Sequence, residues 1–236
     1  HTMDMVSRWL LITRASVFPM TITSGVLGGL LAVAGPTPAA ANWFFLALAL
    51  FGLVLAHAAN NMINDYFDLA GGVDSANYVR GQYAPHPILN GLVSKGGLIA
   101  AIAVVNAIDL AILVYLGTER GPLVYVFALA GLFISVFYVA PPLKLKHHGF
   151  GEPGVFLVWG PLMIAGTYFV TTGAAPAWVF AASLPYALLV TVVLFGKHID
   201  KLEADAAKGI HTLPVILGET QARFVAQALM LSFFVV

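Results

Sequence analysis

Seven apolar segments set the fold class of this sequence, because each has about the 20 residues that a helix needs to cross a bilayer. Hydrophobic residues make up 60% of the 236-residue chain and charged residues 9%, far more apolar surface than a soluble domain requires. We therefore predict an all-α, polytopic transmembrane helical bundle that forms one domain over residues 1–236. The last segment stops within an apolar run, so we expect the sequence to be truncated at its C-terminus. The predicted spans are 9–34, 42–64, 96–117, 122–140, 153–172, 177–197 and 219–236.

Composition also excludes several kinds of function. The chain has no cysteine, which removes disulfides and thiolate metal sites from consideration. Its formal net charge is zero, so electrostatics gives no support for a nucleic-acid partner. Membrane lipid is the expected surrounding, and no obligate protein partner is predicted.

Basic residues are distributed asymmetrically among the loops. Only Arg120 falls on one side of the predicted bundle, where the loops are short. By the positive-inside rule, the N-terminus and the long polar loops 65–95, 141–152 and 198–218 are therefore cytoplasmic. The basic residues on that side are Arg8, Arg14, Arg80, Lys95, Lys144, Lys146, Lys197, Lys201, Lys208 and Arg223.

A first polar cluster, residues 60–68, follows the second apolar segment and leads on to Asp74. Asn64 and Asp68 are four residues apart, so on a helix they share one face, with Asn61 one turn earlier. Carboxylates at the end of a membrane helix are costly and normally have a partner. Mg²⁺ is a natural partner, because it takes oxygen ligands and often binds through phosphates. The alternative is a capped helix end followed by a polar turn.

A second carboxylate cluster, residues 197–205, follows the sixth apolar segment at the same predicted membrane face. Two acidic clusters on two helices are the arrangement needed to hold metal ions that bridge a diphosphate. Nearby Lys and Arg side chains would bind the remaining phosphate oxygens. The alternative is a charged helix cap followed by an exposed loop.

One acidic residue lies away from these clusters. Asp109, with Asn106 three residues before it, falls inside the third apolar segment. We predict an interhelical hydrogen bond for it in preference to a functional role, because no second ionisable group is evident at its depth.

Five short motifs follow one another along the chain and together carry a family resemblance. They are Thr13-Arg14-x3-Phe18-Pro19, Asn64-x3-Asp68 with Gly72-Val73-Asp74, Tyr138-x2-Pro141-Pro142-Leu143-x-Leu145-Lys146 ending in Gly151-Glu152, Gly160-Pro161-Leu162-Met163 to Thr167-Tyr168, and Asp200 to Asp205 with Gly209-x-His211-Thr212-Leu213. In this order they resemble the UbiA superfamily of intramembrane prenyltransferases, over nearly all of the chain. The Gly72-Val73-Asp74 ending is closer to the menaquinone-branch members than to the ubiquinone-branch form. The family has nine helices, whereas seven spans are visible here.

The resemblance implies transfer of a polyprenyl group from its diphosphate, with Mg²⁺ as the cofactor. The second motif departs from the family spacing: Asp200 and Asp205 are five apart instead of four, so either Asp200 acts with Glu203 or the helix is kinked. The implied Mg²⁺ ligands are Asn64, Asp68, Asp74, Asp200, Glu203 and Asp205.

The resemblance also assigns roles to residues around the metal. Aromatic faces that would stabilise the allylic cation are Phe67, Tyr138, Trp159 and Tyr168. The implied catalytic residues are Asp68, Asp74, Asp200, Asp205, Tyr138 and Lys146. The implied substrate-binding residues are Arg14, Asn61, Asn64, Arg80, His86, Lys146, Lys197 and Tyr168.

The acceptor is the least determined partner. The menaquinone-like features imply 1,4-dihydroxy-2-naphthoate, and a prokaryotic plasma membrane as the location. We expect His86 either to contact this acidic aromatic acceptor or to be a turn residue beside proline. Other acceptors in the superfamily are 4-hydroxybenzoate, chlorophyllide, isoprenyl glycerol phosphate and haem. Outside it, an ion-coupled transporter and a structural membrane subunit are the alternatives.

Overall fold

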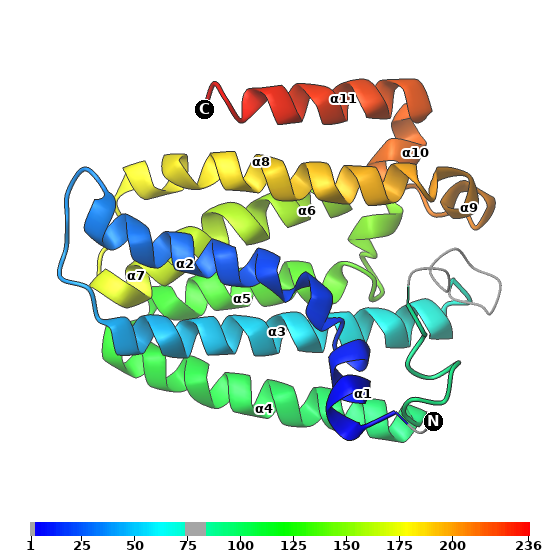
Figure 1. Cartoon of the computed structure of the whole chain (residues 1–236), viewed down its shortest axis with the longest axis horizontal. Coiled ribbons are helices and arrows are strands. Elements are labelled where there is room, and N and C mark those ends of the chain that lie inside the picture. Colours follow the sequence, from blue (N-terminus) through cyan, green and yellow to red (C-terminus); the bar gives the residue numbers. More distant parts are fainter. Residues whose placement is uncertain (1–2, 74–83) are drawn as a thin grey trace.

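Long helices run side by side to form a bundle in a computed structural model that describes residues 3–73 and 84–236 (Figure 1). Within these residues the only extended pairing is an isolated bridge between His148 and His211. The helices are α1 (Met5–Ile12), α2 (Phe18–Ala34), α3 (Trp43–Ala70), α4 (Lys95–Arg120), α5 (Leu123–Phe137), α6 (Gly151–Leu157), α7 (Gly166–Thr172), α8 (Ala177–Ile199), α9 (Leu202–Ala207), α10 (Leu213–Leu217) and α11 (Glu219–Ser232). The all-α prediction is confirmed.

Five of the seven predicted spans are long and apolar enough in the described residues to cross a membrane. The fourth contains α5, a shorter apolar helix of 15 residues, and the seventh contains α11, of 14 residues. α4 is apolar along its length but exposes about half of its large apolar side chains, including Val104, Leu110 and Val114. An apolar helix that faces outward is stable in lipid and unfavourable in water. The bundle is therefore that of an integral membrane protein.

Two predicted helix boundaries were wrong. The span predicted as continuous over 9–34 is broken, because α1 ends at Ile12 and α2 begins at Phe18, with a short 3-10 turn between them. At the break, Arg14 adopts a left-handed backbone conformation with φ 56°, which a continuing helix does not allow. The second span does not end at residue 64: α3 continues through Ala70, so the first polar cluster is helical.

The helix between α6 and α7 is irregular. Residues Val158–Ala165 form a π-helix that contains Pro161. Proline inside a helix removes a backbone donor and displaces the turn before it. The side chain of Ser24 in α2 donates to the carbonyl of Trp159 in this π-helix. The irregular turns are thereby held against α2.

Small residues permit close helix packing around this irregular segment. A Cβ added to Gly28 in α2 would meet the side chain of Thr167 and the carbonyl of Ile164, and one added to Gly160 would meet Ala187 of α8. Membrane helices use small residues in this way, because association without a hydrophobic driving force depends on close van der Waals contact.

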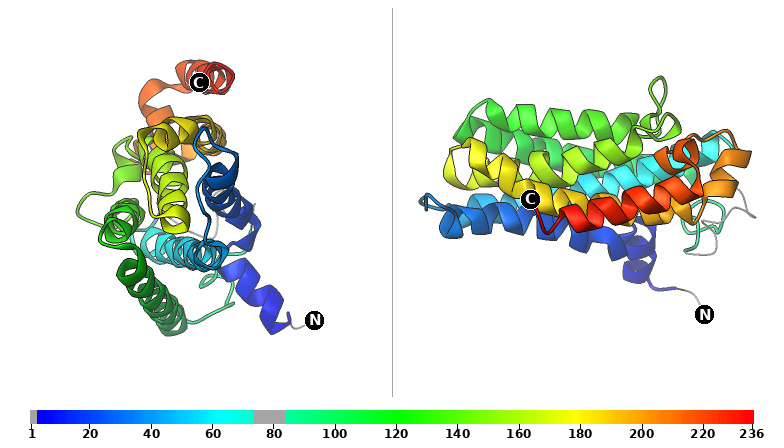
Figure 2. Two further views of the ribbon diagram at one scale, coloured as in Figure 1. Left: turned by 90° about the vertical axis from the view of Figure 1, so that its left-hand side faces the viewer. Right: turned by 90° about the horizontal axis from the view of Figure 1, so that it is seen from above.

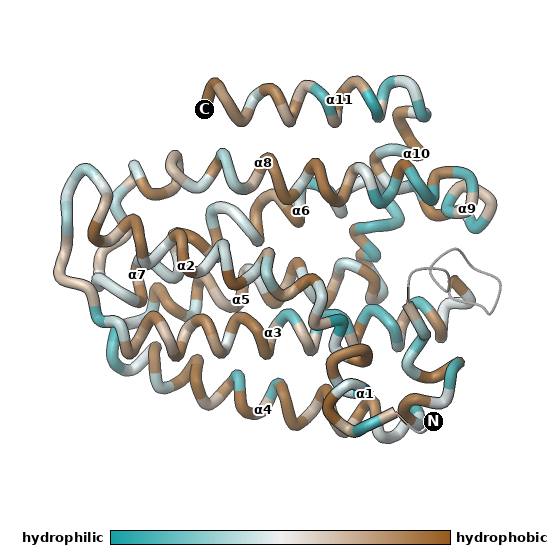
Figure 3. Tube along the Cα trace, viewed as in Figure 1, coloured by the Kyte–Doolittle hydropathy of each residue, from teal (hydrophilic) through white to brown (hydrophobic). Residues whose placement is uncertain are grey.

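Polar residues gather at the end of the bundle where α3 and α8 end, which we call the acidic end (Figures 1 and 3). α9 lies at this end. α1 also lies near this end, and it runs across the direction of the long helices. The views in Figure 2 place α11 outside the bundle, where it packs on α8. At the opposite end, Arg120 donates to the carbonyls of Val170 and Thr171.

Candidate active site

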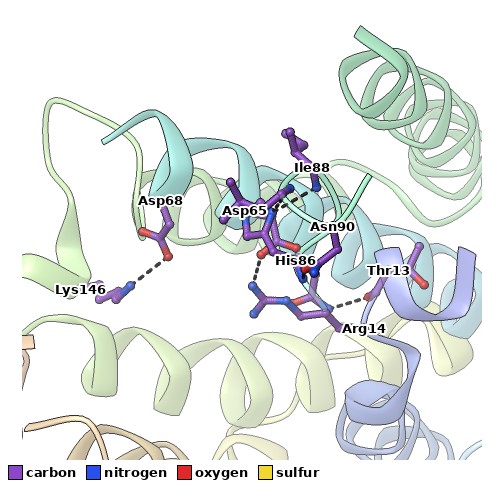
Figure 4. Close-up of polar contacts among 10 residues, drawn as sticks. Thr13, Arg14, Asp65, Asp68, His86, Ile88, Asn90 and Lys146 are labelled. Atoms are coloured by element: carbon purple, nitrogen blue, oxygen red, sulfur yellow. Dashed lines mark hydrogen bonds and ion pairs between the residues drawn. The ribbon is translucent and has the colours of Figure 1, made fainter. Parts of the chain in front are cut away.

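Two carboxylates in the last turns of α3 each pair with a cation from another part of the chain. Asp65 pairs with Arg14, and Asp68 Oδ2 lies 3.1 Å from Lys146 Nζ (Figure 4). Both carboxylates are buried, Asp65 completely. A buried carboxylate needs such a partner, because removing its charge from water is expensive. These pairs tie the α1–α2 break and the loop after α5 to the end of α3.

The helix break places Arg14 beside Asp65. Because the chain leaves α1 at Thr13, the Thr13 carbonyl is free of the helix and accepts a hydrogen bond of 2.9 Å from Asn61 Nδ2. Asn61 lies one turn before Asp65 on α3. The Thr13-Arg14 motif therefore packs on the same helix face as the first acidic cluster.

Lys146 is held by the loop between α5 and α6. A single 3-10 turn, Leu145–His147, carries it, and its backbone N–H donates to the Tyr138 carbonyl at 3.0 Å. Lys144 before it has a left-handed φ of 42°, which turns the chain back toward α3. Burial lowers the pKa of His147 below its ordinary value, and the adjacent Lys146 ammonium acts in the same direction. His147 is therefore neutral near pH 7 and adds no charge beside Lys146.

The second acidic segment is not a single helix. α8 ends at Ile199, Asp200 caps it, and α9 begins at Leu202. Of the two alternatives raised by the spacing, the structure contains the kink. Asp200 and Glu203 are exposed, whereas Asp205 is fully buried, with its Oδ2 3.6 Å from Lys201 Nζ.

The segments that follow α3 and α9 contact each other directly. Val73 packs with Ile210 and Ala204 in a small apolar cluster. Lys208 Nζ donates to the carbonyl of Val73 and, at 3.4 Å, to that of Gly72. The expected neighbourhood of the two acidic clusters is thus found at one end of the bundle. Asp74 and Arg80, two of the predicted site residues, lie outside the described residues.

A cavity of about 1010 Å³ extends from this end into the bundle. α3 lines it from Ala49 to Asn64, a rise of about 22 Å along the helix. The deep part is largely apolar, with Leu116, Val124 and Val170 among its walls, and Asn106 and Asp109 of α4 also line the cavity. Its polar wall contains Arg14, Asn60, Asn61, Asn64, Tyr138, Lys197 and Asp200. The space combines a charged entrance with a long apolar interior.

Not every predicted site residue reaches this cavity. Tyr168 is buried against Ala32 and Ile164, with its ring edge-on to Trp178. His86 is also buried, and its Nδ1 accepts backbone hydrogen bonds from Ile88 and Leu89 within its own turn (Figure 4). Neither is among the cavity-lining residues, and Lys146, Asp68 and Asp205 lie at the acidic end without lining it.

Asp109 differs from its prediction. Its carboxylate lies against Gly52 of α3 and lines the cavity. It makes no side-chain hydrogen bond with the residues described in the structure, so the predicted interhelical bond is not found there.

The donor atoms at the acidic end are chemically suited to Mg²⁺. The described residues contain no group of three His, Asp or Glu side chains that could hold a metal ion. They do contain a buried oxygen, Asn64 Oδ1, that has no hydrogen-bond partner within the described chain. Buried amide oxygens are normally bonded, and this one lies a helical turn from Asp68. An oxygen-only set that combines an unsatisfied amide with carboxylates fits a hard divalent cation.

Sequence reasoning assigned no role to three buried polar side chains. Glu152 Oε1 lies 2.6 Å from His198 Nδ1, which joins α6 to α8. His57 of α3 bonds Thr21 of α2 and lines the cavity. The available signal for His57 was its spacing, because residues 57, 61, 64 and 68 follow the 4, 3, 4 pattern of one helix face.

The fold and site define a class: a multi-pass helical membrane protein with a long apolar cavity that begins at a carboxylate-rich, cation-paired end. The chain belongs to the UbiA prenyltransferase family, whose pattern matches residues 22–236. This confirms the family resemblance in the sequence.

Individual relatives are more distant. UbiA prenyltransferase domain-containing protein 1 of Dictyostelium discoideum is 24% identical over 96% of this chain and 68% of its own length. The 1,4-dihydroxy-2-naphthoate octaprenyltransferase of Bacillus subtilis is 28% identical over 75% of this chain and 56% of its own. The enzyme of that name from Haemophilus influenzae is 25% identical over 93% of this chain and 72% of its own. The matched regions thus span between about half and three quarters of these proteins.

Solved structures share the fold. A UbiA homolog from Archaeoglobus fulgidus, bound to GPP and Mg²⁺, superimposes with a TM-score of 0.73 over 97% of this chain and 75% of its own, at 17% identity. A digeranylgeranylglyceryl phosphate synthase matches with a TM-score of 0.69 over 96% of this chain and 74% of its own.

Proposed function

We propose that this protein transfers a polyprenyl group from its diphosphate to an aromatic acceptor inside the membrane, in a reaction that requires Mg²⁺. The observation that carries the proposal is the cavity of about 1010 Å³, which extends about 22 Å along α3 from a charged entrance into a largely apolar interior. A prenyl diphosphate has the same division, with a charged head and a long apolar tail. Family membership and the fold shared with a GPP-bound homolog support it.

The proposed metal ligands are the oxygen donors of the two acidic segments. Asn64 and Asp68 would hold Mg²⁺ from α3, and Asp205, Asp200 and Glu203 from the kinked second segment. Asp74, which lies outside the described residues, is the sixth proposed ligand. Mg²⁺ bound there supplies neutralising charge to the diphosphate as a leaving group.

The cations of the site are the chain's own contribution to diphosphate binding. Arg14 and Lys197 line the cavity entrance, and Lys146 lies within 3.1 Å of Asp68. We propose that they donate charge-assisted hydrogen bonds to phosphate oxygens, together with Arg80. The carboxylates now paired with Arg14 and Lys146 keep these cations in place when no anion is bound.

The reaction we propose forms one carbon–carbon bond. The C–O bond of the donor breaks and its electron pair leaves with the diphosphate. The ring carbon that bears the acceptor's carboxylate gives an electron pair to the allylic carbon. The acceptor's carboxylate then leaves as CO₂, and its electron pair returns to the ring. The apolar walls of the cavity limit capture of the allylic cation by water, and Tyr138 and Trp159 line the same space with aromatic faces.

We propose 1,4-dihydroxy-2-naphthoate as the acceptor. The proposal rests on the menaquinone-type motifs and on two relatives named for that substrate. 4-Hydroxybenzoate, chlorophyllide and isoprenyl glycerol phosphate are the other acceptors to be compared.

The activity assay uses purified protein in detergent, radiolabelled geranylgeranyl diphosphate, and each acceptor in turn, with Mg²⁺ or EDTA. A prenylated naphthoquinol that forms only with Mg²⁺ is the expected product. A different acceptor that is prenylated instead would correct the substrate and keep the reaction class. Absence of both product and donor binding would contradict the proposal and favour the transporter alternative.

We further propose that the acidic end is cytoplasmic, from the distribution of basic residues, and that the membrane is a prokaryotic plasma membrane, from the menaquinone-type motifs. The lack of native cysteine makes this directly testable. Glu203→Cys in α9 should be inaccessible to an impermeant maleimide added outside intact cells, whereas Ala174→Cys at the opposite end should be labelled. The reverse pattern would contradict the orientation.

A further inference from the structure

His57 is a buried titratable side chain that the proposed chemistry at the acidic end does not use. It lies on α3, is 7% exposed and lines the cavity. Because Asn61 and Asn64 follow it by four and seven residues, the three share one face of the helix. His57 is therefore about 10 Å deeper in the bundle than Asn64.

Two other helices hold the imidazole ring of His57 in place. Thr21 Oγ1 of α2 lies 2.8 Å from His57 Nδ1, and Trp159 Nε1 donates to the same hydroxyl oxygen at 3.1 Å. The Trp159 ring is edge-on to the imidazole at 5.4 Å between centroids, and the Phe18 ring is tilted against it at 5.5 Å. Trp159 belongs to the π-helix, an irregularity that is frequent at functional sites.

The hydrogen-bond partners of His57 favour one tautomer. Trp159 Nε1 can only donate, so it occupies one lone pair of Thr21 Oγ1. Among the described residues, His57 Nδ1 is the acceptor within reach of the Thr21 hydroxyl, so we infer that the hydroxyl proton is donated to it. A neutral ring that accepts at Nδ1 carries its proton on Nε2. Nε2–H makes no hydrogen bond with a described residue and belongs to a ring that lines the cavity.

We propose that His57 is a specificity-determining residue for the acceptor, to which Nε2–H donates a hydrogen bond at a ring hydroxyl or its anion. The inference rests on the proposed function. Within the cavity, the prenyl tail offers no hydrogen-bond acceptor, and the diphosphate is held at the level of Asn64 and Asp68. A small aromatic molecule with a ring oxygen is the remaining reactant that can satisfy this donor. The two helical turns between His57 and Asn64 leave room for the allylic carbon and the acceptor ring.

Two substitutions separate recognition of the acceptor from a purely structural role. His57→Phe keeps an aromatic ring against Trp159 and Phe18 but removes the donor. His57→Gln keeps an N–H donor at a similar distance from the α3 backbone. The measured quantities are KM for 1,4-dihydroxy-2-naphthoate, kcat, and Mg²⁺-dependent binding of radiolabelled geranylgeranyl diphosphate, each in detergent.

For His57→Phe we expect the acceptor KM to rise by about ten- to a hundredfold, the effect of losing a hydrogen bond to a charged or strongly polar group. Donor binding should stay within about twofold of wild type, and His57→Gln should recover most of the acceptor affinity. Should His57→Phe fail to fold, Thr21→Val tests the same claim: without the Thr21 hydroxyl the tautomer is no longer fixed, so the acceptor KM should rise by a smaller factor.

The outcomes distinguish this inference from the proposed function. Wild-type turnover with an unchanged acceptor KM in His57→Phe would overturn the role of His57 alone. Equal loss of donor and acceptor binding would show that His57 only braces the helices. A wild-type protein that neither binds donor nor forms product would overturn the proposed function and this inference with it.

Discussion

Lys146 Nζ lies 3.1 Å from Asp68 Oδ2, and both side chains are buried at the acidic end of the bundle. A lysine from the α5–α6 loop thus neutralises a carboxylate that we propose as a metal ligand. If Mg²⁺ and a diphosphate bind as proposed, Asp68 would help to hold the metal and Lys146 would donate to a phosphate oxygen, so each charge would exchange one partner for another. Binding of donor and metal should therefore be strongly coupled.

Removal of Lys146 tests this exchange of partners. In Lys146→Ala the donor KM should rise by about ten- to a hundredfold, because a charge-assisted bond to phosphate is lost. Without ligands, the thermal midpoint should fall, since Asp68 is left buried and unpaired, and Mg²⁺ with diphosphate should restore much of it. Lys144→Ala, two residues away in the same loop, is the matched control. An unchanged donor KM would remove Lys146 from the phosphate site.

Substitution of Asp68 tests the metal assignment on α3. Asp68→Asn keeps the size of the side chain but removes the charge that would bind Mg²⁺. Turnover should drop by at least about a hundredfold, as is typical when a group that balances developing charge is lost. Glu119→Gln removes an exposed charge in the last turn of α4, far from the acidic end. It should leave turnover intact. Turnover of Asp68→Asn at the wild-type rate would be incompatible with metal binding at this residue.

Asn64 provides a test that depends on metal concentration. Its Oδ1 is buried without a hydrogen-bond partner within the described residues, so we expect Mg²⁺ to be its partner. Asn64→Ala should increase the Mg²⁺ concentration needed for half-maximal donor binding by about tenfold. Asn106→Ala is the control, because the Asn106 side chain already donates to Ile102 within α4 at 2.8 Å. Equal metal requirements in the two variants would leave Asn64 without this role.

The close approach of α2 to the irregular helix predicts an effect on stability. Gly28→Ala would place a methyl group against Thr167 and the Ile164 carbonyl, and overpacking of this kind costs about 1–3 kcal/mol. Gly196→Ala in α8 meets no atom within 4 Å and should be neutral or slightly stabilising. Thermal unfolding in detergent compares the two. Equal midpoints would mean that α2 can shift to accept the methyl group.

Much of the fold could be predicted from sequence because lipid restricts the choices. Backbone groups inside a bilayer must bond within their own segment, so long apolar runs become helices. The acidic clusters were also predictable as neighbours, since both follow apolar segments at the same face. The break at Arg14 was not predicted, because the apolar pattern continues through it and only the Arg14–Asp65 pair shows why the helix ends.

Other features depend on contacts between distant residues. The kink between α8 and α9 turns Asp205 inward while Asp200 remains exposed, and the five-residue spacing alone allowed two interpretations. His86 looked equally suitable as a ligand or a turn residue, and its bonds to Ile88 and Leu89 give it a structural role in its own turn. His57 was overlooked in an apolar stretch, because its importance comes from Thr21 and Trp159, which are far from it in sequence.

The most direct test of the central claim is to locate a bound donor. A prenyl diphosphate analogue with a photoreactive diazirine in its tail is cross-linked to the protein in detergent, and the adducts are mapped by mass spectrometry. The account predicts adducts on cavity-lining residues such as Leu113, Leu116 and Val124, which require Mg²⁺ and disappear with excess geranylgeranyl diphosphate. Adducts confined to the outer face of α4, at Val104 or Ile108, or labelling that is indifferent to Mg²⁺, would contradict it.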